Sequence, residues 1–494
     1  MISKSTPRLL ALGIAGLIWL AASPLWTLGQ EPPAGEARTP EDGSLRSLLE
    51  TYGLDDSAWK RLEDGRPWNT DEDEALLKVM FRLRQVEPIR METWAAQGFP
   101  ISRLPHDSDA LRGQVFSIRG RMRRVEPIQP VPEIADRYEL REYYRCELAL
   151  ASGHRAVVFA EHVPEAWRKS GSAEGRAGAI AVYLKYLGDA AEPMPAFVAR
   201  RLAYFPETLL GELGMDVGLL ENVVEQAPLG TADREAFYQM LAAVGRAAPG
   251  QLLAAAEEQL AAARREATKD GQQPTAANIP PWVRVDEQGE WHYSVVPFFN
   301  KPAEQRGRLV AFSGVARQAL KVLVEEEDLK QRFGLDHYYQ IALFPEDSQG
   351  NPLMFCVRQL PPGLAASETG TIDQPMRIAG FFFKSWAYNV EIPRGMPDME
   401  PGRRIQLAPL IIGLEPVLIA QPQPGAEPWI GVAVVGLIVL VIFAFWLAAW
   451  WQGRSDRVNR ARLGQAPPQQ PPAPFDDWQS TQEPRNINPF QTPE

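Results

Sequence analysis

The stretch RGQVFSIRG at residues 112–120 occurs a second time as RGRLVAFSG at residues 306–314. Both copies keep the spacing of the two glycines and the apolar alternation between them. Alternation with a period of two is typical of a β-strand that buries one face. The chain is therefore expected to contain one β-rich unit that is used twice.

The residues on either side of this stretch match in the same order. Downstream, Tyr143-Tyr144 matches Tyr338-Tyr339, and the later matches pair residues 157–164 with 354–361, 180–185 with 378–384, and 200–202 with 403–405. Upstream, residues 53–85 align without a gap on residues 214–246. A conserved order of matches predicts a tandem duplication, in which a helical segment and a β module are followed by a second helical segment and a second β module.

We predict an α+β multidomain fold made of two such repeats. The first consists of a helical segment at 45–100 and a β module at 110–207; the second consists of a helical segment at 210–270, a linker at 271–300 and a β module at 304–414. Thr70 and Thr231 stand where N-caps are expected, before helices at 71–85 and 232–246. Residues 252–266 are rich in alanine and predict a further helix.

Each β module has short runs rich in Val, Ile, Phe and Tyr, enough for about five strands. Gly120 and Gly314 lie inside strand patterns, where they indicate a bend or bulge of the kind that barrel closure needs. The strand number and the glycine placement resemble the OB-fold, a small barrel. That resemblance implies an open face for oligonucleotides, oligosaccharides or peptides. A β-sandwich is the alternative.

Two long apolar segments lie outside the repeats. Residues 9–28, behind Lys4 and Arg8, predict a signal peptide at 1–29, or an uncleaved signal anchor, followed by a linker at 30–44. After a linker at 415–428, residues 429–451 carry no charge and predict a transmembrane helix in the lipid bilayer. Trp429, Trp450 and Trp451 would lie at the interfaces, and Arg454 and Arg457 would lie on the cytoplasmic side.

This topology places most of the chain outside the cytoplasm, on the periplasmic side, and residues 452–494 inside it. The tail is basic at its start and then rich in proline, which predicts a disordered segment. It is either a docking peptide for a cytoplasmic partner or an inert tail. Cys146 and Cys356 are far apart in the sequence, and the sequence leaves open whether they pair.

The composition excludes several classes of function. The net charge of -11 disfavours a nucleic-acid partner, because binding phosphates requires a basic face. The five histidines have no metal-site spacing, and the sequence has no G-x-S-x-G or P-loop motif. We therefore predict no catalytic residue, no metal and no cofactor.

One cluster suggests a binding site. Arg119, Arg121 and Arg123 share one face of the expected strand, and Arg124 adjoins them. Such a stripe could bind an anionic ligand, a lipid headgroup or an acidic glycan. The alternative is an ordinary solvated face of the barrel.

These features predict a membrane-anchored binding or scaffolding protein of the cell envelope. Its β modules would bind an envelope protein or a glycan. The alternative is an envelope hydrolase that uses converging carboxylates. In layout the chain resembles uncharacterised envelope proteins of planctomycete-type bacteria, a resemblance that implies no particular functional residue.

Overall fold

The computed structural model describes residues 44–104, 106–169, 174–269, 273–366, 371–392, 402–419 and 435–451. The described residues of Met1–Ala420 form one compact unit, and those of Gln421–Glu494 form a second. The predicted signal segment, the tail, Trp429, Arg454 and Arg457 lie outside the described residues.

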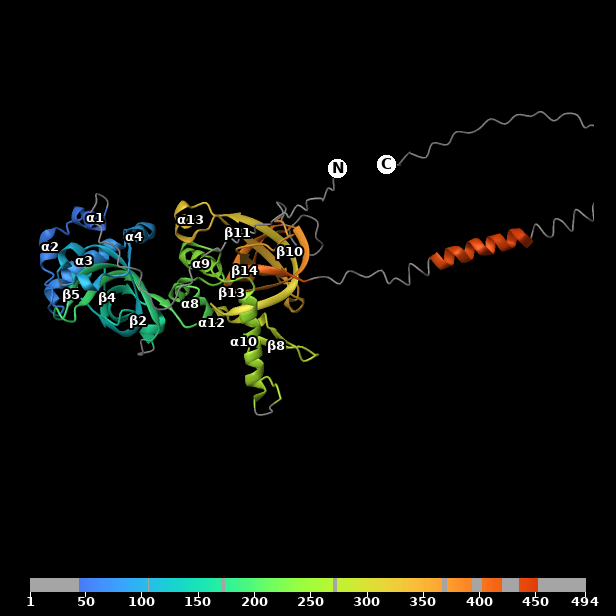
Figure 1. The fold of residues 1–494 in the computed structure, drawn as a ribbon, viewed down its shortest axis with the longest axis horizontal. Helices are drawn as coiled ribbons and strands as arrows, with labels where there is room; N and C mark the ends of the chain where they lie inside the picture. The colour runs from blue at the N-terminus through green and yellow to red at the C-terminus, as the bar shows by residue number, and fades with distance from the viewer. Residues whose placement is uncertain are drawn as a thin grey trace, which may run out of the picture. The chain divides into compact units, whose positions relative to one another are not determined.

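The first repeat begins with short helices and continues into a closed five-stranded barrel (Figure 1). The helical part contains α1 (Leu45–Thr51), α2 (Asp56–Lys60), η1 (Thr70–Glu72), α3 (Asp73–Leu83), α4 (Pro88–Trp94), η2 (Ile101–Arg103) and α5 (Ser108–Leu111). The barrel strands are β2 (Val115–Ile128), β3 (Tyr143–Leu150), β4 (Arg155–His162), β5 (Arg176–Leu187) and β6 (Met194–Arg201). They run in the order β2-β3-β4-β6-β5, and β5 pairs back with β2. The strands β1 (Ala96–Gln97) and β7 (Ala203–Phe205) extend the sheet, while α6 (Pro132–Tyr138) and α7 (Glu165–Lys169) connect barrel strands.

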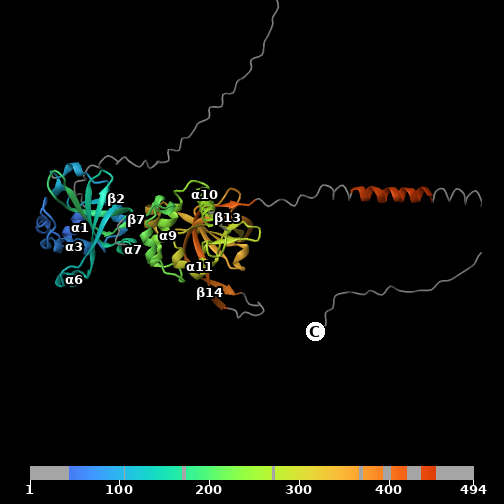
Figure 2. The same cartoon turned by 90° about the horizontal axis from the view of Figure 1, so that it is seen from below.

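The second repeat has the same plan. Its helical part contains α8 (Leu209–Glu212), η3 (Val217–Asn222), α9 (Thr231–Val244), α10 (Gln251–Ala267), α11 (Val296–Asn300) and α12 (Pro302–Gln305), with a hairpin of β8 (Val283–Val285) and β9 (Trp291–Tyr293). The barrel is formed by β10 (Leu309–Leu323), β11 (His337–Phe344), β12 (Leu353–Val357), β13 (Thr371–Ile392) and β14 (Gly402–Leu418), with α13 (Glu327–Phe333) and η5 (Glu346–Ser348) between strands. In both views α9 lies between the strands of the two barrels (Figures 1 and 2).

The two barrels share one strand order, which is β10-β11-β12-β14-β13 in the second. In each, the third and fifth barrel strands pair in parallel and the other neighbours pair antiparallel. Five-stranded barrels agree with the OB-like prediction, and closure removes the exposed sheet edges. The sandwich alternative is wrong, because in each module the first strand pairs directly with the fourth.

The glycines in the repeated stretch have a different role from the one predicted. The register shifts lie two residues later, between Met122 and Arg124 and at the matching place in β10. A Cβ on Gly120 would lie 2.6 Å from the Ala149 carbonyl oxygen, and one on Gly314 would lie 2.5 Å from the Phe344 carbonyl oxygen. These glycines therefore permit close strand contact, and the bulge that bends the strand follows them.

The helix caps are one residue earlier than predicted. Asn69 caps the first turn of η1 and forms a capping box with Glu72. In the second repeat Gly230 occupies the cap position before α9, and its N–H donates to Asp233. The threonines are the first residues of these helices, because the acid two residues after each accepts the N–H of the preceding residue.

The same two acids hold the helical segment of each repeat against its barrel. Lys185 Nζ lies 2.6 Å from Glu72 Oε1, and both side chains are fully buried. Lys384 Nζ lies 2.9 Å from Asp233 Oδ2, and this pair is buried to the same degree. Since Lys185 and Lys384 are matched positions in the repeat, the buried ion pair is a property of the shared framework.

Each repeat also has a buried or half-buried arginine at the same place, paired with an acid. Arg112 Nη2 lies 2.7 Å from Asp64, and Arg306 Nη2 lies 2.6 Å from Glu225. Each arginine also donates to a main-chain carbonyl of its helical segment. The first arginine of the repeated stretch is therefore a structural clamp.

The predicted transmembrane helix at 429–451 is wrong for the residues that the structure describes. The helix there covers residues 435–451, and no described helix is long and apolar enough to cross a membrane. Trp450 and Trp451 belong to this helix and are exposed.

The two cysteines lie in different barrels. Cys146 is in β3 and Cys356 is in β12, and both are free and buried. Burial raises the pKa of both thiols, so they are protonated at neutral pH. Their environment is that of small hydrophobic residues in a core.

Candidate functional site

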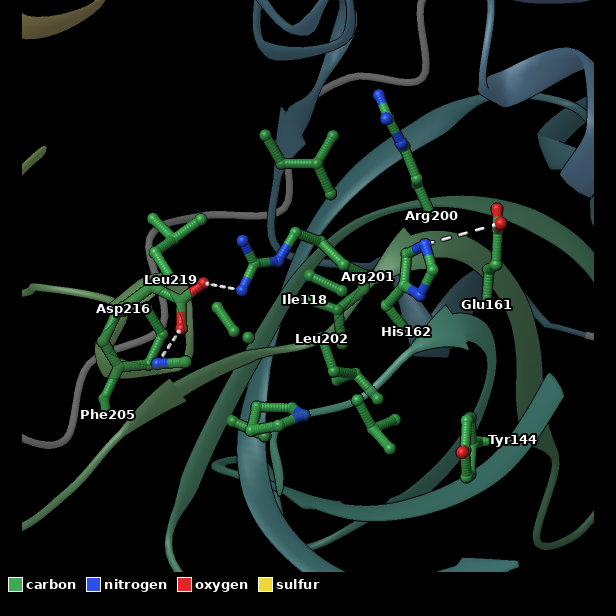
Figure 3. Close-up of a pocket in the computed structure, with 18 of the residues that line it drawn as sticks. Ile118, Tyr144, Glu161, His162, Arg200, Arg201, Leu202, Phe205, Asp216 and Leu219 are labelled. Atoms are coloured by element: carbon green, nitrogen blue, oxygen red, sulfur yellow. Dashed lines mark hydrogen bonds and ion pairs between the residues drawn. The ribbon is translucent and has the colours of Figure 1, made fainter. Parts of the chain in front are cut away.

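A cavity of 2310 Å³ lies between the first barrel and the helical segment of the second repeat. One wall is the face of β2 and β5, and another is α4. Residues of α8, η3 and α9 complete the lining, and Figure 3 labels Leu219 of η3 among them. The cavity is therefore completed by residues of both repeats.

The lining of this cavity is rich in arginine. It contains eleven arginines, nine carboxylates and no lysine among the described residues. The arginines are Arg84, Arg119, Arg121, Arg123, Arg141, Arg168, Arg176, Arg200, Arg201, Arg246 and Arg332. The lining is thus net positive, although the chain as a whole carries -11.

Some of these arginines are held by carboxylates and build the walls. Arg84 lies 2.8 Å from Glu161, and Arg201 lies 2.7 Å from Asp216. Arg332, on α13, contacts a glutamate of α4 and one of α9 at 2.8 and 2.6 Å. Arg332 therefore links the two repeats at the edge of the cavity.

Asp216 is a structural acid. Its Oδ1 accepts hydrogen bonds from the Tyr204 N–H at 2.8 Å and the Gly218 N–H at 3.0 Å. Burial raises the pKa of Asp216, and the Arg201 guanidinium opposes that shift. Its repeat counterpart, Asp55, caps α2 by accepting from the Ala58 N–H. An acid used as a cap in both repeats is poorly placed to transfer protons to a substrate.

Five arginines of the lining, Arg123, Arg141, Arg176, Arg200 and Arg246, have no carboxylate within ion-pair distance among the described residues. Arg176 and Arg246 donate to main-chain carbonyls, which leaves Arg123, Arg141 and Arg200. All three are exposed to solvent in the cavity. Figure 3 shows Arg200 pointing away from the Arg201–Asp216 pair. These guanidinium groups are available to an anionic ligand.

Only part of the predicted arginine stripe lines the cavity. Arg119, Arg121 and Arg123 all line the cavity, whereas Arg124 is outside it and pairs with a neighbouring glutamate on β2. The bulge between Met122 and Arg124 interrupts the period-two alternation at Arg123. Arg121 is paired with a glutamate beyond β7.

A histidine extends this site and was not predicted. His162, at the end of β4, lies 3.4 Å from Glu161. Burial lowers the pKa of His162; Glu161 opposes this shift, and Arg200 and Arg201 add to it. Arg246 lies near Arg119, and burial, with a smaller effect of that neighbouring charge, lowers the pKa of Arg246. The Arg200-Arg201 pair is visible in the sequence, but only the fold brings it next to His162.

Several acids of the cavity are already engaged by other groups. Among the carboxylates of this cavity, Glu161 and Asp216 each face an arginine, and Glu221 accepts from the Glu165 N–H and faces Arg168. Across the described part of the chain, no group of three or more His, Cys, Asp and Glu residues comes together as a metal site would require. The cavity has the chemistry of anion binding.

Comparison with known proteins assigns no family. No family model matches the chain, and no curated protein matches it. Among solved structures, it was matched to crystal structures of the enzymatic component C2-I of the C2-toxin from Clostridium botulinum. At pH 6.1 the identity is 11%, the alignment covers 76% of this chain and 99% of that chain, and the TM-score is 0.11. At pH 3.0 the identity is again 11%, with 74% and 96% covered and a TM-score of 0.11. TM-scores this low carry no structural argument.

Proposed function

We propose that the protein is a non-catalytic binding protein whose large cavity takes an acidic oligosaccharide. The observation that carries this proposal is the set of three arginines, Arg123, Arg141 and Arg200, that face the cavity without a carboxylate partner among the described residues. A buried or confined guanidinium binds a carboxylate through two parallel N–H donors. Other arginines of the lining are already paired with acids.

The size of the cavity supports an oligomeric ligand. Pockets for single small molecules measure about 300–1,000 Å³. The volume of 2310 Å³ exceeds that range. The chain's net charge of -11 disfavours a nucleic acid, which would meet repulsion outside the cavity. An acidic glycan needs only local positive charge.

The test is isothermal titration calorimetry with tetragalacturonate, using maltotetraose as the neutral oligosaccharide. The triple variant Arg123→Gln, Arg141→Gln and Arg200→Gln should raise the Kd for tetragalacturonate at least about tenfold, because each charge-assisted hydrogen bond contributes about 1.5–3 kcal/mol. Arg155→Gln is the matched control, since Arg155 is exposed and lies outside the cavity lining.

Binding that is unchanged in the triple variant would refute the proposal, as would equal affinity for maltotetraose. If an acidic peptide bound through the same arginines and tetragalacturonate did not bind, the glycan would be the wrong ligand. A hydrolase would cut tetragalacturonate into shorter products during incubation. We expect no shorter products. The proposal that the protein acts outside the cytoplasm rests on the apolar segment at 9–28 alone.

A further inference from the structure

The second barrel has a smaller cavity of its own, with a volume of 570 Å³. It lies where the end of β10, the start of β11 and the segment after β12 meet. The lining residues that matter here are Lys321, His337, Tyr339, Arg358, Leu360 and Leu364. None of them contributes to the larger cavity.

This cavity occupies the same place in its barrel as one end of the larger cavity occupies in the first barrel. Tyr144 pairs with Pro127 on one side and Ala160 on the other. Tyr339 pairs in the same way with Lys321 and Val357. The residue that follows the connecting helix also has the same left-handed backbone, at Glu139 and at Gly334. The two sites are therefore duplicated copies of one concave surface.

The charges of the two copies differ at matched positions. Glu142 and Glu161 in the first barrel correspond to His337 and Arg358 in the second. Pro127, which has no charge, corresponds to Lys321. At a further matched position the change runs the other way, from Arg141 to Asp336. The duplication has therefore kept a concave surface and rearranged the charges on it. A different charge pattern changes the ligand that the surface can bind.

Two cationic side chains, Lys321 and Arg358, line this cavity together with the His337 ring. Lys321 is the direct cross-strand partner of Tyr339, and His337 lies two residues before Tyr339 on the same strand face. Arg358 makes a long hydrogen bond of 3.4 Å to the Gly334 carbonyl oxygen. Within the described residues, neither Lys321 nor Arg358 has a carboxylate within ion-pair distance, and the nearby acid of the lining is Asp336. Burial lowers the pKa of both His337 and Arg358.

Beside these polar groups, the cavity has an aromatic ring and aliphatic side chains that suit an organic body. The Tyr339 ring lies edge-on to the His337 ring, with centroids 5.3 Å apart and an interplanar angle of 89°. Leu360 and Leu364 are half-buried and pack against the barrel core. The volume lies within the range of about 300–1,000 Å³ typical of small-molecule sites.

We propose that this cavity is a second binding site, independent of the larger one, for a small organic anion with an aromatic or aliphatic body. Lys321 and Arg358 would hold the anionic head, and Tyr339, Leu360 and Leu364 would contact the body. This proposal does not depend on the acidic-oligosaccharide function, because it uses different residues and a different class of ligand.

The test uses the full chain and benzenesulfonate, which stays a monoanion throughout the working pH range. Isothermal titration calorimetry at pH 7.5 compares it with inorganic sulfate, which lacks the ring, and with benzenesulfonamide, which lacks the charge. Arg358→Gln and Lys321→Gln should each raise the Kd for benzenesulfonate about tenfold. Arg358→Glu, which restores the charge found in the first barrel, should abolish binding. Arg155→Gln is the control and should change nothing.

Three results would overturn the proposal. The first is a Kd that stays within about twofold of wild type in both glutamine variants. The second is loss of binding in Arg200→Gln without loss in Arg358→Gln, which would place the anion in the larger cavity. The third is equal affinity for benzenesulfonate and either reference compound. Lys321 is exposed and Arg358 lies at the end of a strand, so folding of both variants can be verified by unchanged thermal unfolding.

Discussion

Replacing Lys185 with methionine tests whether the buried ion pair is what holds each helical segment to its barrel. The change keeps the length of the side chain but leaves the Glu72 carboxylate without its cation. Glu72 is fully buried and would retain the main-chain N–H groups of Glu63 and Asn69, each at 3.1 Å. Removing one partner of a buried ion pair costs about 3–5 kcal/mol. We expect Lys185→Met to lower the free energy of unfolding by about that amount.

The assay is urea unfolding followed by tryptophan fluorescence, because Lys185 Nζ lies 5.5 Å from the centre of the Trp68 ring. Lys60→Met is the matched control: Lys60 is exposed, so the change should stay within about 0.5 kcal/mol. Adding Glu72→Gln to Lys185→Met removes the buried charge and should recover at least about 1 kcal/mol. A cost below about 1 kcal/mol for Lys185→Met, or no recovery in the double variant, would refute the reasoning.

The remaining predictions concern strand contact, the cavity and the link between the repeats. Gly120→Ala and Gly314→Ala should each cost about 1–3 kcal/mol by urea unfolding, since the added Cβ meets a carbonyl oxygen of the next strand, whereas Gly230→Ala, with open space around it, should cost much less. Tetragalacturonate affinity should rise as the pH falls below about 6.5. The pKa of His162 lies below that value in the free protein, and a bound anion favours the protonated ring. The variant His162→Gln should not show this rise in affinity. Arg332→Gln should cost about 1–2 kcal/mol and speed proteolysis between the repeats, since it breaks ion pairs to α4 and α9; an unchanged cleavage rate would contradict this link.

The repeat and its barrels could be predicted from the sequence because their signals are local. The alternation and glycine spacing around Gly120 and Gly314 lie within nine residues, and the ungapped match of 53–85 with 214–246 already aligns Glu72 with Asp233. The ion pair itself was not predicted, since Lys185 is far from Glu72 in the sequence and only barrel closure brings them together. The bulge position was also misplaced, because register depends on the partner strand.

The cavity could be predicted less well than the fold. Arg119, Arg121 and Arg123 were identified from their spacing on one strand, and all three line the cavity. Arg141 and Arg200 come from a loop and from another strand, so no periodic pattern connects them. Whether an arginine is free for a ligand depends on carboxylates distant in the sequence, as the pairing of Arg121 with a residue beyond β7 shows.

The duplication explains why two copies of one surface would take ligands of different size. The framework residues are the same in kind: a buried lysine–carboxylate pair and an arginine clamp occur in both repeats. In the first repeat, however, α8, η3 and α9 of the following repeat add a wall and enlarge the cavity to 2310 Å³. The copy in the second barrel is lined by residues of that barrel and its own loops, and it encloses 570 Å³. The position of a repeat in the tandem therefore sets the size of its site. Differences at matched positions, such as Glu161 in the first barrel and Arg358 in the second, set the charge of the site. Size and charge can therefore be altered separately.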